Sequence, residues 1–224
     1  MDCKAVIFDL DGTLVDSLCD LWMSTNHALM QCGFPLRTRD EVCSFVGNGV
    51  GELIHKAVPG GTDAEQEARC LDCFRAHYVE HCRDHTGLYD GVEPMLATLR
   101  ARGLRTAIVS NKLQAGVDSI CQWLFRGLVD VAVGEHGHVR RKPWPDMLLE
   151  AMRQLRVEPH EVVYVGDSDV DIQTARAAGV PCLSVLWGFR SRDFLLAHGA
   201  RVLLSHPQEV CSFLFPPQES PLRL

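Results

Sequence analysis

The stretch at residues 5–17 reads AVIFDLDGTLVDS and joins an apolar run directly to two aspartates and a glycine. Its first part, residues 5–10, is short and rich in Val, Ile and Phe, which predicts a strand buried inside a parallel sheet. Asp9 and Asp11 therefore stand at the carboxyl end of this strand, which is where ligands bind in parallel α/β sheets. The stretch thus predicts both the first strand of the fold and the position of a binding site.

Further strand-like runs recur along the chain and alternate with segments of helical periodicity. This alternation is typical of a doubly wound, Rossmann-like α/β core with a parallel sheet. We expect the other strands at residues 105–110, 129–133, 162–165, 182–186 and 201–204. We expect the helices at residues 92–102, 114–123, 145–155, 170–178 and 191–198.

The alternation stops between residues 16 and 85, where the sequence shows no convincing strand. The clearest element there is a helix at residues 63–82, with one apolar stripe formed by Ala64, Ala68, Leu71, Tyr78 and Cys82. We therefore predict an all-helical cap domain over residues 16–85, inserted into a catalytic core of residues 1–15 and 86–224. The proline-rich stretch 216–221 predicts a loose tail.

The composition argues against several classes of function. The net charge is -7 and the isoelectric point about 5.8, and the short basic run at residues 140–142 cannot form a nucleic-acid groove. No apolar stretch is long enough to span a bilayer, and no signal peptide is visible at the start. The ten cysteines are scattered rather than arranged as in a small secreted domain. These features predict a cytoplasmic protein that binds neither nucleic acid nor membranes.

Polar side chains follow several of the predicted strands, and the carboxyl ends of parallel strands meet at one edge of a sheet. Four carboxylates gathered there would repel one another unless a cation neutralised them. Oxygen ligands with room left for water and phosphate suit Mg²⁺. The residues expected to converge are Asp9, Asp11, Ser110, Asn111, Lys142, Asp167 and Asp171.

This set of residues can carry out phosphoryl transfer. An aspartate held by a metal ion and a lysine is a competent nucleophile toward phosphorus. A second carboxylate two residues along can protonate the leaving group and later activate water, while Lys142 and the Ser110 hydroxyl grip the phosphoryl group. Each motif alone has a common structural explanation as a cap, a turn or a solvated charge, but four of them in order favour catalysis.

With these ordered motifs, the chain resembles the haloacid dehalogenase superfamily over nearly its whole length. The resemblance implies that Asp9 is the nucleophile and Asp11 the general acid and base. Gly12 and Thr13 would shape the loop and donate backbone hydrogen bonds to phosphate.

The same resemblance implies the remaining site residues. The ligands of Mg²⁺ would be the Asp9 carboxylate, the Asp11 backbone carbonyl and the Asp167 carboxylate. Ser110 with its neighbour Asn111, and Lys142, match the positions that bind phosphate, and Asp171 matches an acid that supports either the metal site or the lysine. The set is Asp9, Asp11, Asp167, Ser110, Asn111, Lys142 and Asp171.

Within the superfamily, the chain is most similar to bacterial phosphoglycolate phosphatases. Residues 46–49, which include Asn48, resemble the loop that the cap of those enzymes lowers over the active site, and residues 186–189 resemble a later motif. The resemblance implies a mobile cap and hydrolysis of a small phosphate monoester, with 2-phosphoglycolate as the first candidate. Trp144 departs from the pattern, because many relatives have His there.

Alternative functions stay open at this point. A phosphatase or phosphomutase acting on pyrophosphate, a nucleotide or a sugar phosphate would share these motifs. A non-catalytic phospho-acceptor or binding module would not need Asp11, so its presence favours turnover. Both a monomer and a homodimer fit the sequence.

Two cysteines and two histidines at helical spacing also invite a zinc hypothesis. On a straight helix the set would extend over about 16 Å, which is too far for one tetrahedral site. We therefore expect buried thiols beside solvated imidazoles. The residues are Cys70, Cys73, His77 and His81.

Overall fold

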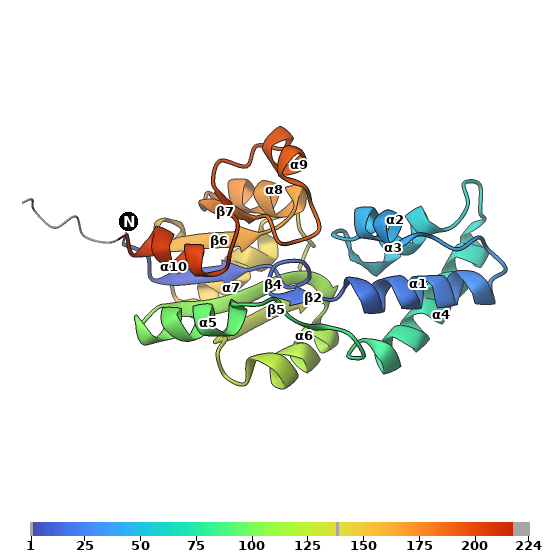
Figure 1. The fold of residues 1–224 in the computed structure, drawn as a ribbon, viewed down its shortest axis with the longest axis horizontal. Helices are drawn as coiled ribbons and strands as arrows, with labels where there is room; N and C mark the ends of the chain where they lie inside the picture. The colour runs from blue at the N-terminus through green and yellow to red at the C-terminus, as the bar shows by residue number, and fades with distance from the viewer. Residues whose placement is uncertain (1, 138, 217–224) are drawn as a thin grey trace, which may run out of the picture.

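The computed structural model describes residues 2–137 and 139–216, and within them six strands form one parallel sheet (Figure 1). The sheet order is β5-β4-β1-β6-β7-β8, so the first strand lies in the middle. The strands are β1 (Ala5–Phe8), β4 (Arg105–Leu113), β5 (Val131–Glu135), β6 (Val162–Gly166), β7 (Cys182–Val185) and β8 (Leu203–Leu204). The expected parallel α/β sheet is therefore confirmed.

Strand β1 is apolar throughout because both of its faces and both of its edges are covered. All of its residues are buried, and it pairs with β4 on one side and β6 on the other. Phe8 lies opposite Ile108 of β4 and Val165 of β6. This register places the end of β1 beside Ile108 and Val165, close to where Ser110 and Asp167 follow along the neighbouring strands.

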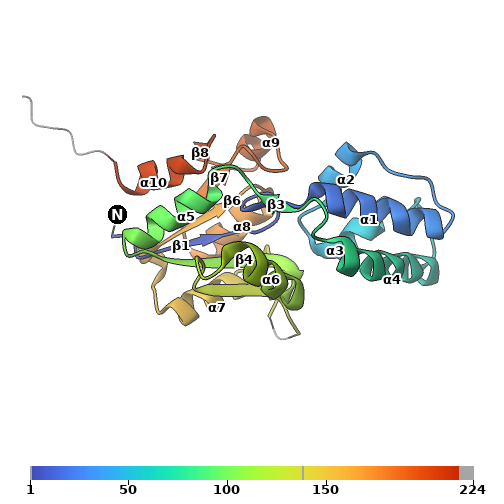
Figure 2. The same cartoon turned by 60° about the horizontal axis from the view of Figure 1, so that its bottom comes forward.

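Helices cover both faces of the sheet, as a doubly wound fold requires (Figure 2). One face packs against α5 (Val92–Ala101), α6 (Gln114–Ile120) and α10 (Gln208–Leu214). The other packs against α7 (Asp146–Leu155) and α8 (Asp169–Ala178). The remaining elements are a π-helix at Cys121–Phe125, a 3-10 helix at Pro159–Glu161 and α9 (Arg192–Ala197).

The helical segment between the first and second strands of the sheet has a core of its own. It comprises α1 (Leu18–Gln31), α2 (Arg39–Phe45), α3 (Gly49–Ala57) and α4 (Ala64–His81). Figures 1 and 2 show these helices beside the carboxyl end of the sheet. Their buried side chains, such as Leu29, Ile54 and Phe74, form a separate apolar cluster. The expected helix at 63–82 is present as α4, but its Ala64 and Ala68 are exposed, and Cys70, Phe74 and Tyr78 form its buried stripe.

A short antiparallel ribbon joins the helical segment to the sheet. It pairs β2 (Val15–Asp16) with β3 (Gly87–Leu88), so the two chain crossings lie side by side. Neither strand was predicted, because a two-residue strand carries no periodicity. The predicted domain boundaries, 1–15 with 86–224 for the core and 16–85 for the cap, stay a prediction.

Three further expectations concern membranes, metals and the tail. No helix in the described part of the chain is long and apolar enough to cross a membrane. Within the same residues, the Cys and His set on α4 does not form a metal-ligand cluster; His77 instead stacks between His27 and His81. Residues 217–221 of the expected proline-rich tail lie outside the described residues.

Candidate active site

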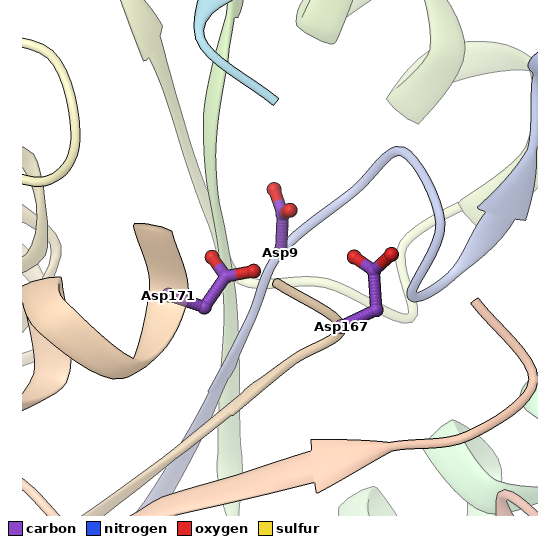
Figure 3. A group of neighbouring side chains, drawn as sticks. All are labelled: Asp9, Asp167 and Asp171. Atoms are coloured by element: carbon purple, nitrogen blue, oxygen red, sulfur yellow. The ribbon is translucent and has the colours of Figure 1, made fainter. Parts of the chain in front are cut away.

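Three aspartates converge at the carboxyl end of the central strands. Asp9 follows β1, Asp167 follows β6, and Asp171 lies in the first turn of α8. Each offers a carboxylate oxygen, and these oxygens all lie within 4.8 Å of one another. Figure 3 shows the carboxyl groups of Asp9 and Asp167 turned to the same side, with Asp171 beside Asp9. Asp9 and Asp167, which are far apart in sequence, therefore face one small volume.

Lys142 places a buried positive charge between two of these carboxylates. Its Nζ lies 2.7 Å from Asp9 Oδ1 and 2.7 Å from Asp171 Oδ1, and the residue is 4% exposed. Burial alone would lower the pKa of Lys142, but the charges of Asp171 and Asp9 raise it overall. The side chain is therefore an ammonium group held against Asp9.

One ammonium group does not balance the acids around it. Burial and then the nearby charge of Asp171 raise the pKa of Asp9 well above its usual value, although Lys142 opposes the shift. Burial and Asp171 likewise raise the pKa of Asp167 to about 7. Each of these acids is thus costly to ionise unless more positive charge enters the site.

Both carboxylate oxygens of Asp171 accept hydrogen bonds from groups of the protein. Its Oδ1 accepts hydrogen bonds from Lys142 Nζ at 2.7 Å and from Tyr164 Oη at 3.0 Å. Its Oδ2 accepts from the Ser168 backbone N–H at 3.1 Å and the Ser168 hydroxyl at 2.6 Å. Asp171 therefore holds the lysine, which is one of the two roles that the sequence left open.

Two glycines make room for the carboxyl group of Asp167. Gly12 has a φ of +88°, and a Cβ added there would lie 2.4 Å from Asp167 Oδ2. A Cβ on Gly188 would lie 2.3 Å from the Asp167 Cβ and 2.3 Å from the Gly12 carbonyl oxygen. The Phe189 backbone N–H and the Thr13 hydroxyl donate to Asp167 at 2.7 and 3.2 Å. Close backbone packing thus fixes the direction of this carboxylate.

The backbone amides after Asp11 are used within the loop itself. The Gly12 N–H donates to the Val15 carbonyl at 2.9 Å, and the Thr13 N–H donates to the Leu10 carbonyl at 3.3 Å. Both amides thus have partners within the loop, and the expected hydrogen bonds from Gly12 and Thr13 to phosphate stay a prediction.

Among the described residues, hydrogen-bond donors reach only the Oδ1 oxygen of the Asp11 carboxylate. Its Oδ1 accepts from the Ser17 hydroxyl at 2.6 Å and from Lys112 Nζ at 3.3 Å. Lys112 also meets Tyr78 of α4, with Nζ 2.7 Å from the hydroxyl oxygen. Sequence reasoning assigned no role to Ser17, Lys112 or Tyr78. Lys112 was noted only as the last residue of the segment 109–112, which resembles the second motif of the family.

The candidate active site is a cavity between the helical segment and the sheet. Its floor includes Asp9, Asp11, Ser110 and Lys142. The Ser110 hydroxyl accepts from the Lys112 backbone N–H at 3.2 Å. The helical segment contributes an apolar roof formed by Leu21, Val46, Gly47, Gly49, Val50 and Leu53.

Side chains of the core hold the last turn of α2 and the segment that follows it over this cavity. Arg190 donates to the carbonyl oxygens of Cys43, Ser44 and Val46 at 2.7, 3.3 and 2.5 Å. Arg141 donates to the Asn48 carbonyl at 3.3 Å. Carbonyls at the end of a helix lack partners within it, so they are ready acceptors.

Asn111 joins the same network. Its Nδ2 donates to the carbonyls of Gly47 and Lys142 at 2.9 and 3.0 Å, and its Oδ1 accepts from the Lys142 N–H at 2.8 Å. The Asn111 amide thus fixes both the lysine and the roof. The Asn48 side chain is not among the groups lining the described cavity, and neither is Trp144, which is 55% exposed.

Comparison with known proteins identifies the family. The model of the haloacid dehalogenase-like hydrolases matches residues 6–185. This chain belongs to that family. The phosphoglycolate phosphatase of Chromobacterium violaceum is 36% identical over 197 residues, with 86% of this chain and 89% of the relative covered. That of Aquifex aeolicus is 32% identical and covers 83% of this chain and 86% of the relative.

Solved structures named as phosphoglycolate phosphatases share the fold over 96% of this chain. One from Lactobacillus delbrueckii subsp. bulgaricus has a TM-score of 0.91 at 34% identity and covers 96% of this chain and 99% of its own. The predicted phosphoglycolate phosphatase of Haemophilus somnus has a TM-score of 0.89 at 26% identity, with the same coverage. The expected superfamily, its likeness to bacterial phosphoglycolate phosphatases and the enzyme class, phosphoric monoester hydrolase, are confirmed.

Proposed function

We propose that this haloacid dehalogenase-like hydrolase cleaves a small phosphate monoester through a phospho-aspartate on Asp9, with Mg²⁺ as its cofactor. The first candidate substrate is 2-phosphoglycolate, which the names of the curated relatives favour. The observation that carries the proposal is the Asp9 carboxylate, which lies against the Lys142 ammonium in the acidic cluster with Asp167. A buried carboxylate in this setting is suited to attack phosphorus.

The two acids of the first motif take different parts in the proposed reaction. Asp9 attacks phosphorus in line, and Asp11 gives a proton to the departing alcohol. Asp11 then takes a proton from the water that hydrolyses the acyl phosphate. Ser110 and Lys142 bind the phosphoryl oxygens, and Asp171 keeps Lys142 in place.

The residues at the sheet edge fit a divalent cation of the magnesium type. Asp9 and Asp167 offer hard carboxylate oxygens. Burial, and next the charge of Asp171, raises the pKa of both acids, and a bound cation would favour their charged forms. We propose that these two carboxylates and the Asp11 backbone carbonyl hold the ion. Bound there, Mg²⁺ would offset the negative charge of the phosphoryl group.

The roof of the cavity favours a small substrate. Arg190, Arg141 and Asn111 hold residues 43–48 close to the floor, and Val46, Val50 and Leu53 fill the space above the acids. We propose that this cap is a lid that excludes water during turnover. The cytoplasmic location and the choice between monomer and homodimer stay predictions from the sequence.

A panel of phosphate esters tests the proposed substrate. We expect kcat/KM for 2-phosphoglycolate to exceed that for nucleotides and sugar phosphates by about tenfold or more, because the closed roof discriminates by size. Pyrophosphate, which is about as small as 2-phosphoglycolate, is included as the alternative that size does not exclude. Chelation by EDTA should abolish turnover, and added Mg²⁺ should restore it.

Different outcomes of this panel contradict different parts of the proposal. If another ester ranks first, the proposed substrate is wrong, whereas the proposed hydrolysis of phosphate esters is supported. Conversion of one sugar phosphate to its isomer, without release of inorganic phosphate, would instead establish the phosphomutase alternative. Phosphate release from none of the esters would favour the binding module.

A further inference from the structure

A chain of contacts leads from the helical segment to Asp11 through one lysine of the core. The hydroxyl oxygen of Tyr78, on α4, lies 2.7 Å from Lys112 Nζ. Lys112 Nζ in turn lies 3.3 Å from Asp11 Oδ1, and Ser17 donates to the same oxygen at 2.6 Å. Asp11 Oδ2, in contrast, receives no hydrogen bond from any residue that the structure describes. The two oxygens of this carboxyl group are therefore not equivalent.

The asymmetry matters because a carboxyl group that transfers a proton must present one oxygen to the reacting atoms. The terminal torsion of an aspartate is broad, so the group turns freely unless donors hold it. Lys112 is suited to this task, since its side chain is 9% exposed and its contact with Asp11 is shielded from water. Tyr78, 9% exposed, covers the lysine, with Nζ 4.8 Å from the centre of its ring.

We propose that Lys112 is a positioning residue that holds Oδ1 of Asp11 and leaves Oδ2 to transfer the proton, and that Tyr78 makes this arrangement depend on the cap. The inference rests on the proposed function, because it assigns the oxygen through which Asp11 acts. Lys112 also lines the cavity, but in this assignment it acts through Asp11 and transfers no proton itself. Its ammonium protons stay on nitrogen throughout.

The proton balance follows from this assignment. In the first step the proton on Oδ2 moves to the ester oxygen as the phosphorus–oxygen bond breaks, the alcohol departs, and phosphorus bonds to an Asp9 oxygen. In the second step Oδ2 takes a proton from a water whose oxygen bonds to phosphorus. The bond between Asp9 and phosphorus then breaks, and inorganic phosphate leaves.

The test compares two leaving groups in Lys112→Met. The value of kcat/KM covers only the steps up to departure of the alcohol. An alkyl alcohol, as in 2-phosphoglycolate, needs a proton to depart, whereas p-nitrophenolate is stable without one. We expect kcat/KM for the alkyl ester to fall about 30- to 100-fold, within the range for general acid catalysis, and that for p-nitrophenyl phosphate about threefold or less.

Further variants separate positioning from other roles. Tyr78→Phe keeps the ring packed on Phe74 and removes only the hydroxyl. Its kcat/KM for the alkyl ester should also fall more than that for p-nitrophenyl phosphate, but only by about three- to tenfold. In an Asp11→Asn background, Lys112→Met should cause no further loss, because the two residues act as one unit. Lys56→Met, on the surface of α3 beside Glu52, controls for the lost charge and should resemble the wild type.

Equal losses for both esters would overturn the inference, because a general disturbance of the site does not distinguish leaving groups. A further loss in the Asp11→Asn background would also overturn it, since Lys112 would then bind phosphate directly. If Lys112→Met does not fold, Tyr78→Phe carries the test alone, and an unchanged ratio of the two kcat/KM values contradicts the proposal. Full activity of Asp9→Asn would instead refute the proposed function.

Discussion

Asp9→Asn is expected to lower phosphate release by about 10⁴-fold or more, the scale seen when a covalent nucleophile is removed. The amide has nearly the shape of the carboxylate but cannot attack phosphorus. The fold should survive, because the substitution removes a buried negative charge from a crowded acidic cluster and Lys142 keeps Asp171 as a partner. Steady-state release of phosphate from 2-phosphoglycolate and p-nitrophenyl phosphate, together with thermal unfolding, measures both effects.

A surface variant provides the control for the Asp9 experiment. Asp72→Asn makes the same chemical change on α4, where the side chain is 77% exposed and meets only Arg75 at 3.6 Å. It should keep wild-type turnover. An Asp9→Asn protein that is folded and still turns over within tenfold of the wild type, a loss of about 1.4 kcal/mol or less in transition-state stabilisation, would rule out Asp9 as the nucleophile.

Asp167→Asn is expected to weaken Mg²⁺ binding by about tenfold or more, since replacing a ligand costs at least as much as changing the groups around it. The variant loses one of the two charged oxygen donors assigned to the ion. Its stability without metal should be no lower, because an amide oxygen can still accept from the Phe189 N–H and one buried like charge has gone. Activation of turnover by Mg²⁺ and the rise of the melting temperature with Mg²⁺ both report the affinity.

The matched control for Asp167 is Asp169, which lies two residues later, at the first position of α8. Asp169 is a half-buried acid whose carboxylate meets Gln173 at 3.5 Å and belongs outside the metal cluster. Asp169→Asn should therefore keep the wild-type response to Mg²⁺. An unchanged Mg²⁺-dependent rise of the melting temperature in Asp167→Asn would show that the ion binds without this carboxylate.

The parts of the site that sequence predicts are those set by the ends of strands. An apolar run followed at once by aspartate fixes both the strand and the place of the acid, because β1 is buried between β4 and β6 and its last residue, Phe8, pairs with both. The proximity of Asp9 and Asp167 could therefore be predicted from the sequence. Lys142 directly follows no strand, so its place at the site was inferred from its position before a helix and from the family resemblance.

Contacts between the two parts of the chain were not predictable. The pairing of Tyr78 with Lys112 depends on how α4 packs against the end of β4, and helical periodicity says nothing about that distance. Asn111 was expected among the residues that bind phosphate or substrate, which stays a prediction, but its hydrogen bonds to the carbonyls of Gly47 and Lys142 carried no signal in the sequence. Arg190 carried no signal of its own, because its partners are backbone carbonyls, which every sequence supplies.

The central claim is that Asp9 accepts the phosphoryl group at the shared edge of the sheet, with a divalent cation present. The most direct measurement is mass spectrometry of the wild-type enzyme quenched in acid during turnover of p-nitrophenyl phosphate, with Mg²⁺ or with EDTA. We predict the added mass of one phosphoryl group on the peptide that contains Asp9, in the Mg²⁺ sample only. A phosphoryl group on a different residue, or the same label on Asp9 in both samples, would contradict the account.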